Sequence, residues 1–285
     1  MYQAGVVLEG GAMRGVYTAG VVDAFLDNDI EFSTIYGVSA GACHGASLLS
    51  KQRGRAFRVS VDYLDDKKYC SFSNLITTGN LFGVDMLFNR IQNELDPYDY
   101  AACEAYEGRF FVVATNVETG EAEYIQMTAD DLRNKMEYMQ ASCSMPLVAQ
   151  IVNVDGKSYM DGCIADSVPI RRALADGNQK VVVVRTRAMD YQLAPNSLLP
   201  LIRLRYRKYP NFVHGCATRH IHYADMRSFL EQAENDGRAF VLAPTKEAGV
   251  GTVCKDRQKL EAFYEIGYQD ASDRMGALKA FLGDC

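Results

Sequence analysis

The 285-residue chain contains no tryptophan and only four histidines, so any mechanism that needs a histidine must use one of those four. No uninterrupted apolar stretch is long enough to span a bilayer. The amino terminus also lacks the charged region and the cleavage pattern of an export signal. We therefore expect a cytoplasmic protein whose contact with a membrane, if any, is peripheral at its surface.

Positive charge is scarce as well. Lysine and arginine total 30 against 36 acidic residues, which gives a formal net charge of −6. Proteins that bind nucleic acid non-specifically usually carry a basic excess, so we expect no nucleic-acid partner. Hydrophobic residues at 48% and charged residues at 23% are ordinary globular values and exclude a disordered or collagen-like chain.

The eight cysteines form no CxxC pair and no Cys/His cluster, which excludes a zinc site of the usual spacing. Without an export signal, we expect them to be reduced, mostly buried small residues rather than disulfides. Three histidines, in the segment HGCATRHIH, are spaced in a way that faintly suggests metal binding, but no complete ligand set accompanies His214, His220 and His222. We expect neither a metal nor another cofactor.

The first fifty residues contain two strand-turn-helix units. Residues 4–8 are apolar and end at a glycine turn, after which a helical apolar pattern follows Gly15. Residues 32–36 are β-prone, residues 37–41 form a glycine-flanked turn, and a helix rich in small residues follows. Repeated units of this kind predict an α/β fold with a parallel sheet.

Later segments extend this sheet. The apolar runs 109–115 and 181–184 have the character of strands covered on both faces, and the turns Thr119-Gly120 and Asp155-Gly156 predict two hairpins. Beyond residue 190 the pattern becomes helical at 217–235, 257–269 and 271–282. We therefore expect an α/β domain over residues 1–190 and a helical C-terminal region over residues 191–285, packed on the core.

The segment Gly37-Val38-Ser39-Ala40-Gly41 matches the pattern GxSxG between a strand and a helix. A serine on such a strained turn presents its hydroxyl, while the adjacent helix N-terminus favours developing negative charge. The same five residues can also form a purely structural turn.

The preceding turn, Gly10-Gly11-Ala12-Met13-Arg14-Gly15, is able to direct consecutive backbone N–H groups at one oxygen, as an oxyanion hole does. Glycine turns at helix N-termini also bind phosphates. This turn, however, lacks both the GxGxxG spacing and the Gly-Lys-Ser/Thr ending of nucleotide-binding loops.

Taken together, the residues resemble the patatin-like phospholipases. That family combines a GGGx(R/K)G turn, a GxSxG motif and a DGG or DGA motif in this order, and the chain offers GGAMRG, GVSAG and, at Asp161-Gly162-Cys163, DGC. The likeness covers residues 4–190 and includes segments similar to the family's A-S-x-x-x-P and Asn-x-Pro stretches, at Ala141-Ser142, Pro146 and Ser167-Val168-Pro169. Ala12, Cys163 and Ser167 depart from the family pattern.

The resemblance implies a three-layer α/β/α sandwich with a mainly parallel central sheet and a lipid acyl hydrolase. Its nucleophile would be Ser39, its base Asp161, and its oxyanion hole the N–H groups of Gly11, Ala12 and Ala40. The remaining motif glycines are Gly10, Gly15, Gly37, Gly41 and Gly162. Arg14 stands where the family has a basic residue, and either contacts a substrate head group or fixes its loop through a salt bridge.

A histidine base is harder to place. His44 lies five residues beyond Ser39, about 7.5 Å further along the helix axis and on a different face, so we expect a structural residue with a hydrogen-bonded imidazole. Asp161 instead follows a hairpin, and burial can raise the proton affinity of such a carboxylate until it acts as a base. The nearby Asp155 and Asp166 suit turn and loop roles.

Two other functions fit the same residues: an esterase or thioesterase on small soluble acyl compounds, and a non-catalytic protein that binds an acyl ligand or lipid. The basic segment 203–208 either forms a patch that contacts anionic lipid or is a solvated helix face.

Overall fold

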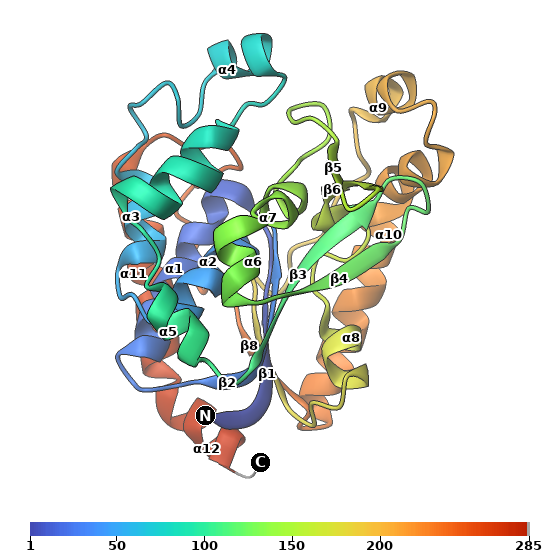
Figure 1. Ribbon diagram of the computed structural model, residues 1–285. Helices are drawn as coiled ribbons and strands as arrows, with labels where there is room; N and C mark the ends of the chain where they lie inside the picture. Colours follow the sequence, from blue (N-terminus) through green and yellow to red (C-terminus); the bar gives the residue numbers. More distant parts are fainter. Residues whose placement is uncertain (284–285) are drawn as a thin grey trace.

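The apolar runs of the sequence form one mixed sheet at the centre of the molecule (Figure 1). The computed structural model describes residues 1–283. Within them the sheet has eight strands in the order β5-β6-β3-β2-β1-β7-β8, with β4 also paired to β3. The strands are β1 (Tyr2–Leu8), β2 (Phe32–Val38), β3 (Arg109–Asn116), β4 (Ala122–Met127), β5 (Val152–Val154), β6 (Lys157–Asp161), β7 (Val181–Val184) and β8 (Ala239–Leu242).

The centre of the sheet is parallel, as predicted. Strand β1 runs parallel to β2 and β7, and the pairs β2-β3 and β7-β8 are parallel too. Antiparallel pairing is confined to one side, where β4 and β6 pair with β3 and β5 pairs with β6.

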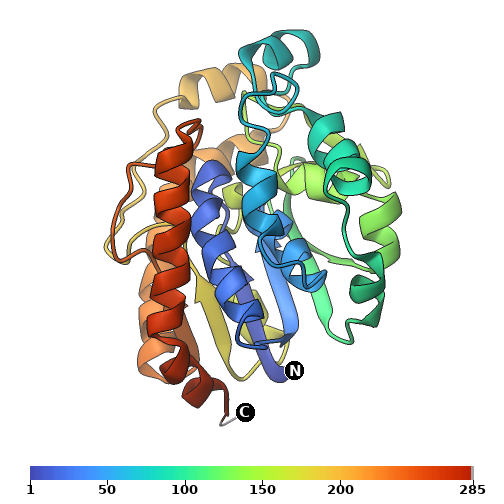
Figure 2. The same ribbon diagram turned by 90° about the vertical axis from the view of Figure 1, so that its left-hand side faces the viewer.

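Helices cover both faces of the sheet, which confirms the three-layer sandwich (Figures 1 and 2). One face carries α1, α2, α3 and α11, and the other carries α8 and α10. The helical segments are η1 (Ala12–Gly15), α1 (Val16–Leu26), α2 (Ala40–Leu49), α3 (Arg55–Val61), α4 (Phe72–Thr78), η2 (Met86–Leu95), α5 (Tyr100–Ala105), α6 (Ala129–Asn134), α7 (Glu137–Ser142), η3 (Gly162–Ile164), α8 (Ile170–Ala175), α9 (Leu199–Arg205), α10 (Pro210–Asn235), α11 (Arg257–Asp273) and α12 (Met275–Gly283).

Each central strand contributes to two hydrophobic cores, because successive side chains of a strand point to opposite faces. In β7, Val182 and Val184 join the core beneath α1 and α11, whereas Val181 and Val183 join the core beneath α8 and α10. A strand buried on both faces needs apolar residues at every position, which explains the unbroken Val-Val-Val-Val run.

Both predicted hairpins are present. Strands β3 and β4 flank the turn at Thr119-Gly120, and β5 and β6 flank Asp155-Gly156. Asp155 and Gly156 both have positive φ, at 48° and 76°. Such a pair fits the tight hairpin turn that matches the twist of the strands. The second hairpin places Asp161 at the last position of β6.

The helices predicted for the C-terminal region are present, but the description of that region as helical was incomplete. Strand β8 also comes from it and pairs with β7. A four-residue apolar run is too short for periodicity to separate a strand from a buried helical turn, so the sequence pattern missed it. No helix within residues 1–283 combines the length and apolar character needed to cross a membrane.

Candidate active site

Ser39 occupies a sharp turn between β2 and α2. Its backbone has φ 54° and ψ −125°, a conformation that costs energy for any residue other than glycine. A Cβ on Gly37 would lie 2.4 Å from the Cα of Ala42, and one on Gly41 would lie 2.2 Å from the carbonyl oxygen of Leu8. The two glycines of the motif are therefore required by close backbone approach, as expected for a nucleophile elbow.

The register of β3 explains why Ser39 and Asp161 meet. Val38, the last residue of β2, pairs with Val113, and Asp161 pairs with the next residue, Ala114. Strand β2 runs parallel to β3 and β6 runs antiparallel to it, so their ends converge on the same point of β3. Residues separated by 122 positions in the sequence are thus in contact.

The Ser39 hydroxyl donates a hydrogen bond of 3.2 Å to Oδ2 of Asp161. The other carboxylate oxygen of Asp161 accepts the backbone N–H of Cys163 at 2.8 Å. Both side chains are buried, with Ser39 4% and Asp161 3% exposed. Burial raises the pKa of Asp161, while the hydrogen bond from Cys163 and the positive charge of Arg219 act in the opposite direction. This arrangement favours uptake of the serine proton by the carboxylate.

The last residue of α7 and the segment that follows it hold the pair in place. Ser142 accepts the backbone N–H of Ser39 at 2.8 Å and donates to the carbonyl of Val113 at 2.6 Å. The carbonyl of Ser144 accepts the backbone N–H of Asp161 at 2.9 Å. The sequence marked Ser142 only as part of the family resemblance, and nothing in the sequence marked Ser144.

The glycine turn packs directly against the serine. A Cβ on Gly10 would lie 2.4 Å from Sγ of Cys163 and 2.9 Å from Cβ of Ser39. The N–H groups of Gly11, Ala12 and Ala40 are not used by the hydrogen bonds that stabilise the fold of residues 1–283. Their role as an oxyanion hole stays a prediction, compatible with this arrangement.

Arg14 does not point to a substrate. Its side chain is 2% exposed, and its guanidinium donates to the carbonyls of Thr186 and Val250 and to both carboxylate oxygens of Glu247. These bonds use all five donors of the guanidinium, which favours the loop-fixing alternative over contact with a head group. The neighbouring Gly15 is also needed for packing, since a Cβ there would lie 2.6 Å from Nε2 of His44.

Gly162 is likewise constrained, because its Cβ would lie 2.2 Å from the carbonyl oxygen of Val113. The other two aspartates near Asp161 in the sequence have tyrosine partners. Asp155 accepts a hydrogen bond from the hydroxyl of Tyr138, and Asp166 accepts one from the hydroxyl of Tyr124, each at 2.7 Å.

His44 is buried on α2, and desolvation lowers its pKa to about 4. Its Nδ1 finds no hydrogen-bond partner among residues 1–283, so the expected hydrogen-bonded imidazole was wrong. The other three histidines lie on α10. In the described part of the chain, no group of three or more His, Cys, Asp or Glu side chains is arranged to hold a metal ion.

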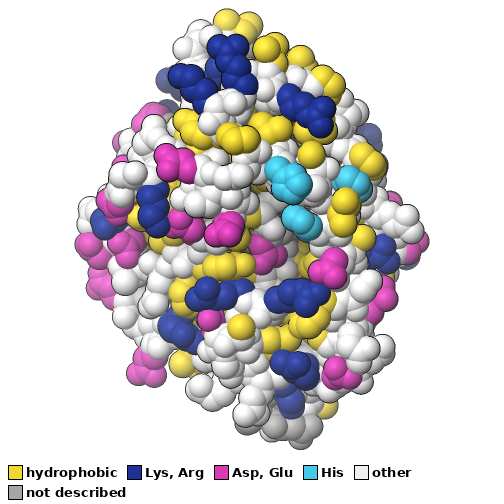
Figure 3. All heavy atoms as spheres, turned by 90° about the vertical axis from the view of Figure 1, so that its right-hand side faces the viewer, with side chains coloured by type: hydrophobic (Ala, Val, Ile, Leu, Met, Phe, Trp, Pro, Cys, Tyr) yellow, Lys and Arg dark blue, Asp and Glu magenta, His cyan; other side chains and the backbone are white. Residues whose placement is uncertain are grey.

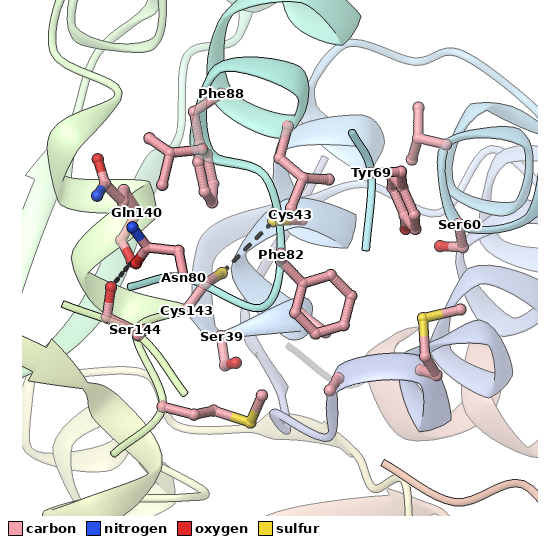
Figure 4. A pocket seen from close by; sticks show the side chains of 18 of the residues that line it. Ser39, Cys43, Ser60, Tyr69, Asn80, Phe82, Phe88, Gln140, Cys143 and Ser144 are labelled. Atoms are coloured by element: carbon pink, nitrogen blue, oxygen red, sulfur yellow. Dashed lines mark hydrogen bonds between the residues drawn. The ribbon is translucent and has the colours of Figure 1, made fainter. Parts of the chain in front are cut away.

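Two cavities meet at Ser39. The first, the apolar cavity, runs beneath α2, α7 and η2 and is walled largely by aromatic and aliphatic side chains (Figure 4). The second, called the polar cavity after its charged groups although most of its wall is apolar, contains Asp161, the glycine turn and two arginines, Arg187 and Arg219. Residues of the apolar wall include Val59, Tyr69, Phe82, Val84, Leu87, Phe88 and Val148.

Comparison with known proteins gives matches over most of the chain. The family model "Patatin-like phospholipase" matches residues 6–174, and a model for a domain of unknown function matches residues 209–283. An uncharacterized protein of Escherichia coli, YjjU, is 26% identical over 85% of this chain and 68% of its own length. A probable lipid hydrolase of Invertebrate iridescent virus 6 is 21% identical over 63% of this chain and 66% of its own length.

Among solved structures, VipD from Legionella pneumophila superposes with a TM-score of 0.56 at 13% identity. The match covers 97% of this chain and 67% of VipD. At that identity the likeness concerns the fold. This chain thus spans about two thirds of the length of each of the three proteins.

Proposed function

The chain belongs to the patatin-like phospholipase family, and from this premise we propose that it is a serine acyl hydrolase that cleaves a carboxylic ester bond of a lipid. The observation that carries the proposal is the hydrogen bond of 3.2 Å from the Ser39 hydroxyl to Asp161, made at a strained strand-to-helix turn. A structural turn has no need of a buried carboxylate at the serine hydroxyl. A catalytic dyad does.

In the proposed mechanism Asp161 accepts the proton of Ser39 while Oγ attacks the ester carbonyl. The N–H groups of Gly11, Ala12 and Ala40 stabilise the oxyanion of the tetrahedral intermediate. Collapse of that intermediate expels the alcohol, which takes the proton from Asp161, and leaves an acyl-enzyme. Water activated by the same carboxylate then releases the fatty acid.

The two cavities suit different parts of a lipid substrate. An acyl chain fits the apolar cavity, because its aliphatic and aromatic wall removes hydrocarbon from water. The polar cavity holds Arg187 and Arg219, whose side chains are only partly buried, and therefore suits the head-group side of the ester. This division favours a lipid over a small soluble ester, which would leave the apolar cavity unfilled.

Helices α4 and α9 lie at the same end of the molecule (Figure 1). Both helices expose large apolar side chains there: Phe72 and Ile76 on α4, at 78% and 84%, and Leu201 and Leu204 on α9, at 54% and 66%. Leu198, which is exposed at the start of α9, also lines the polar cavity, so the α9 part of this surface is continuous with the site. We assign it to contact with a lipid surface.

Positive charge accompanies the apolar residues at the α9 end, as Figure 3 shows. Exposed basic side chains of α9 and of the segment that follows it are Arg203, Arg205, Arg207 and Lys208. Ile202 of α9 and Tyr206 directly after it pack into a hydrophobic core, whereas Leu201 and Leu204 face solvent. Helix α9 therefore has one apolar side that packs on the protein and exposed apolar residues on another. Anionic head groups complement such a surface.

The function is tested with a fluorophosphonate probe and a panel of substrates. We expect the probe to label Ser39, and Ser39→Ala to abolish both labelling and ester hydrolysis. Phospholipids or glycerides should be turned over faster than short nitrophenyl esters at equal concentration. Labelling at another serine, or full turnover by the variant, contradicts the proposal.

The panel also separates the two alternatives. A preference for short esters would favour the small-substrate esterase or thioesterase. A protein that binds a fatty acid but is neither labelled nor active would favour the non-catalytic acyl-binding protein.

The lipid surface is tested by sedimentation with anionic vesicles at low salt. Each basic residue contributes about 1 kcal/mol at an anionic surface. The double variant Arg203→Gln/Arg205→Gln should therefore bind about thirtyfold less, which corresponds to about 2 kcal/mol. The matched control, Lys259→Gln/Lys279→Gln, removes two exposed charges from α11 and α12. Equal sedimentation of both variants would overturn the assignment.

A further inference from the structure

The apolar cavity contains two thiols that the proposed mechanism does not use. Cys43 belongs to α2, Cys143 follows the last residue of α7, and their sulfur atoms lie 3.8 Å apart. Figure 4 shows the two sulfurs facing each other close to Ser39. Both side chains line the cavity and are partly exposed, so reagents that enter the cavity can reach them.

Cys43 has the more reactive thiol. Its pKa is lowered, chiefly by the hydrogen bond from the Cys143 thiol and further by the positive charge of Arg55. Burial instead raises the pKa of Cys103 and Cys216 to about 12. The thiolate is the nucleophilic form of cysteine, so Cys43 is the thiol of this pair that reacts first.

Cys143 occupies a sensitive position in the support of the dyad. The residue before it, Ser142, accepts the backbone N–H of Ser39, and the residue after it, Ser144, accepts the backbone N–H of Asp161. Cys43 lies one helical turn beyond Ser39 on α2. A covalent link between the two sulfurs would therefore join the two segments that position the nucleophile and the base.

We propose that Cys43 and Cys143 form an oxidation site for peroxides, and that the resulting disulfide closes the apolar cavity to acyl chains. The Cys43 thiolate attacks one oxygen of the peroxide, whose O–O bond breaks, and the second oxygen leaves as hydroxide or alkoxide and takes up a proton. The sulfur of Cys143 then attacks the sulfenic acid on Cys43, and water leaves. The two thiols lose two hydrogen atoms in total. Hydrogen peroxide is reduced to two molecules of water, and an alkyl peroxide to one water and one alcohol.

Bond formation requires the two sulfur atoms to approach from 3.8 Å to about 2 Å. The disulfide links α2 to residues 142–144 across the cavity wall beside Ser39, and in the proposal this link narrows the cavity and alters the support of Ser39 and Asp161. The effect on hydrolysis rests on the proposed function, whereas the disulfide and the closure of the cavity do not.

The purified protein is treated with hydrogen peroxide and digested without reduction, and the peptides are analysed by mass spectrometry. We expect a cross-linked peptide joining Cys43 to Cys143. We also expect binding of a fluorescent fatty acid, and fluorophosphonate labelling of Ser39, to fall by at least about tenfold. Dithiothreitol should restore both.

For each variant, fatty-acid binding and fluorophosphonate labelling are measured after oxidation and divided by the values of the same variant in its reduced form. Differences between the variants before oxidation therefore cancel. Cys43→Ala, or Cys143→Ala if the first variant does not fold, should have ratios near one. Cys254→Ala removes a partly exposed thiol that is not among the residues lining the cavity, and should respond like the wild type.

Absence of the cross-linked peptide in the treated wild type overturns the proposal, as does an equal loss of fatty-acid binding in Cys43→Ala. If the reduced protein is not labelled by the fluorophosphonate, the hydrolase proposal fails. The cross-linked peptide and the loss of fatty-acid binding still test the oxidation site at Cys43 and Cys143 in that case.

Discussion

Asp161 combines two opposing influences on its proton affinity. Burial raises its pKa above the ordinary value for aspartate, and the N–H of Cys163 and the charge of Arg219 limit that rise. A carboxylate with a raised pKa accepts a serine proton more readily, as long as it remains ionised at the working pH. As the proposed base, Asp161 therefore uses both the burial and the positive charge.

The first prediction separates a serine-aspartate dyad from a histidine mechanism. Asp161→Asn keeps the shape of the side chain but removes its basicity, and we expect kcat/KM to fall at least about a hundredfold, or about 2.7 kcal/mol of barrier. His44→Gln should stay within about tenfold, or about 1.4 kcal/mol, because the serine hydroxyl is bonded to Asp161.

The same comparison extends to His214→Gln, His220→Gln and His222→Gln, with circular dichroism as the check of folding. A folded Asp161→Asn enzyme of near-normal rate would refute the dyad, and so would one histidine variant as inactive as Ser39→Ala.

The second prediction concerns the pH dependence of activity. The base must be ionised, so activity is lost as the pH falls through the pKa of Asp161. Arg219 lowers that pKa through its charge. Arg219→Gln should therefore raise the pKa and move the midpoint of the acid limb of kcat/KM to higher pH.

Arg187→Gln provides the matched control, because Arg187 lines the same cavity but stacks on Tyr191. An acid limb that moves equally in both variants, or in neither, would show that Arg219 does not set the pKa of the base.

The sequence located Ser39 and Asp161 because each lies in a short motif whose turn chemistry is local. It left the role of Arg14 open, since no pattern tells whether the donors of a guanidinium are already used by distant carbonyls such as that of Thr186. Arg219 escaped notice for the same reason. Its contact with the carbonyl of Cys163 spans 56 positions and exists only in the folded chain.

Among the helices, α1 and α11 make an unusually close contact, visible in Figure 2. A Cβ on Gly20 of α1 would lie 2.1 Å from the carbonyl oxygen of Tyr264, and one on Gly267 of α11 would lie 2.1 Å from that of Tyr17. Backbone atoms cannot move aside as a flexible side chain can. Glycine on each helix therefore permits the contact.

The third prediction follows from this contact. Gly20→Ala should destabilise the fold by roughly 2 kcal/mol, as overpacked cores usually do, and lower Tm by roughly 6 °C for a chain of this size. In the control Gly276→Ala, a Cβ meets nothing within 4 Å on α12. That variant should gain up to about 1 kcal/mol from helix propensity. Thermal melts of the two variants that coincide would contradict the packing argument.

At the level of whole elements, short apolar runs predicted the strands β1, β2, β3 and β7, and helical periodicity predicted the three C-terminal helices. Short elements were harder. Helix α4 is seven residues long and buries none of them, so its sequence carries no amphipathic signal. Its importance for the proposed lipid surface arises from its position at the same end of the molecule as α9 (Figure 1), which local sequence does not encode.

The molecule as a whole concentrates its chemistry at one end. Ser39 directly follows β2, Asp161 is the last residue of β6, and both cavities contain Ser39. Helices α4 and α9 lie at this end of the molecule (Figure 1). The opposite end carries the N-terminus and α12. A protein with this arrangement can face a lipid surface with its site while the rest of the fold stays in water.

The expected division at residue 190 stays a prediction, and the structure supplies arguments about how independent the two parts are. Strand β8 covers the edge of β7, and α11 covers α1, so each part completes the other. The Tyr17 ring contacts Phe263 at 5.5 Å between centroids, and the Tyr17 hydroxyl donates to Asp270. These contacts join residues more than 240 positions apart within one hydrophobic core.

The last prediction is that residues 1–190, produced alone, do not fold into a stable enzyme. Without residues 191–285 the four valines of β7 form a bare sheet edge, which is a template for aggregation. The apolar face of α1 beneath α11 is exposed as well. We expect the fragment to be insoluble, or to lack cooperative thermal unfolding and fluorophosphonate labelling. Co-expression of residues 191–285 should restore a soluble complex that is labelled at Ser39. A fragment 1–190 that unfolds cooperatively and is labelled on its own would show instead that the α/β part is an independent domain and that the C-terminal region is an addition to it.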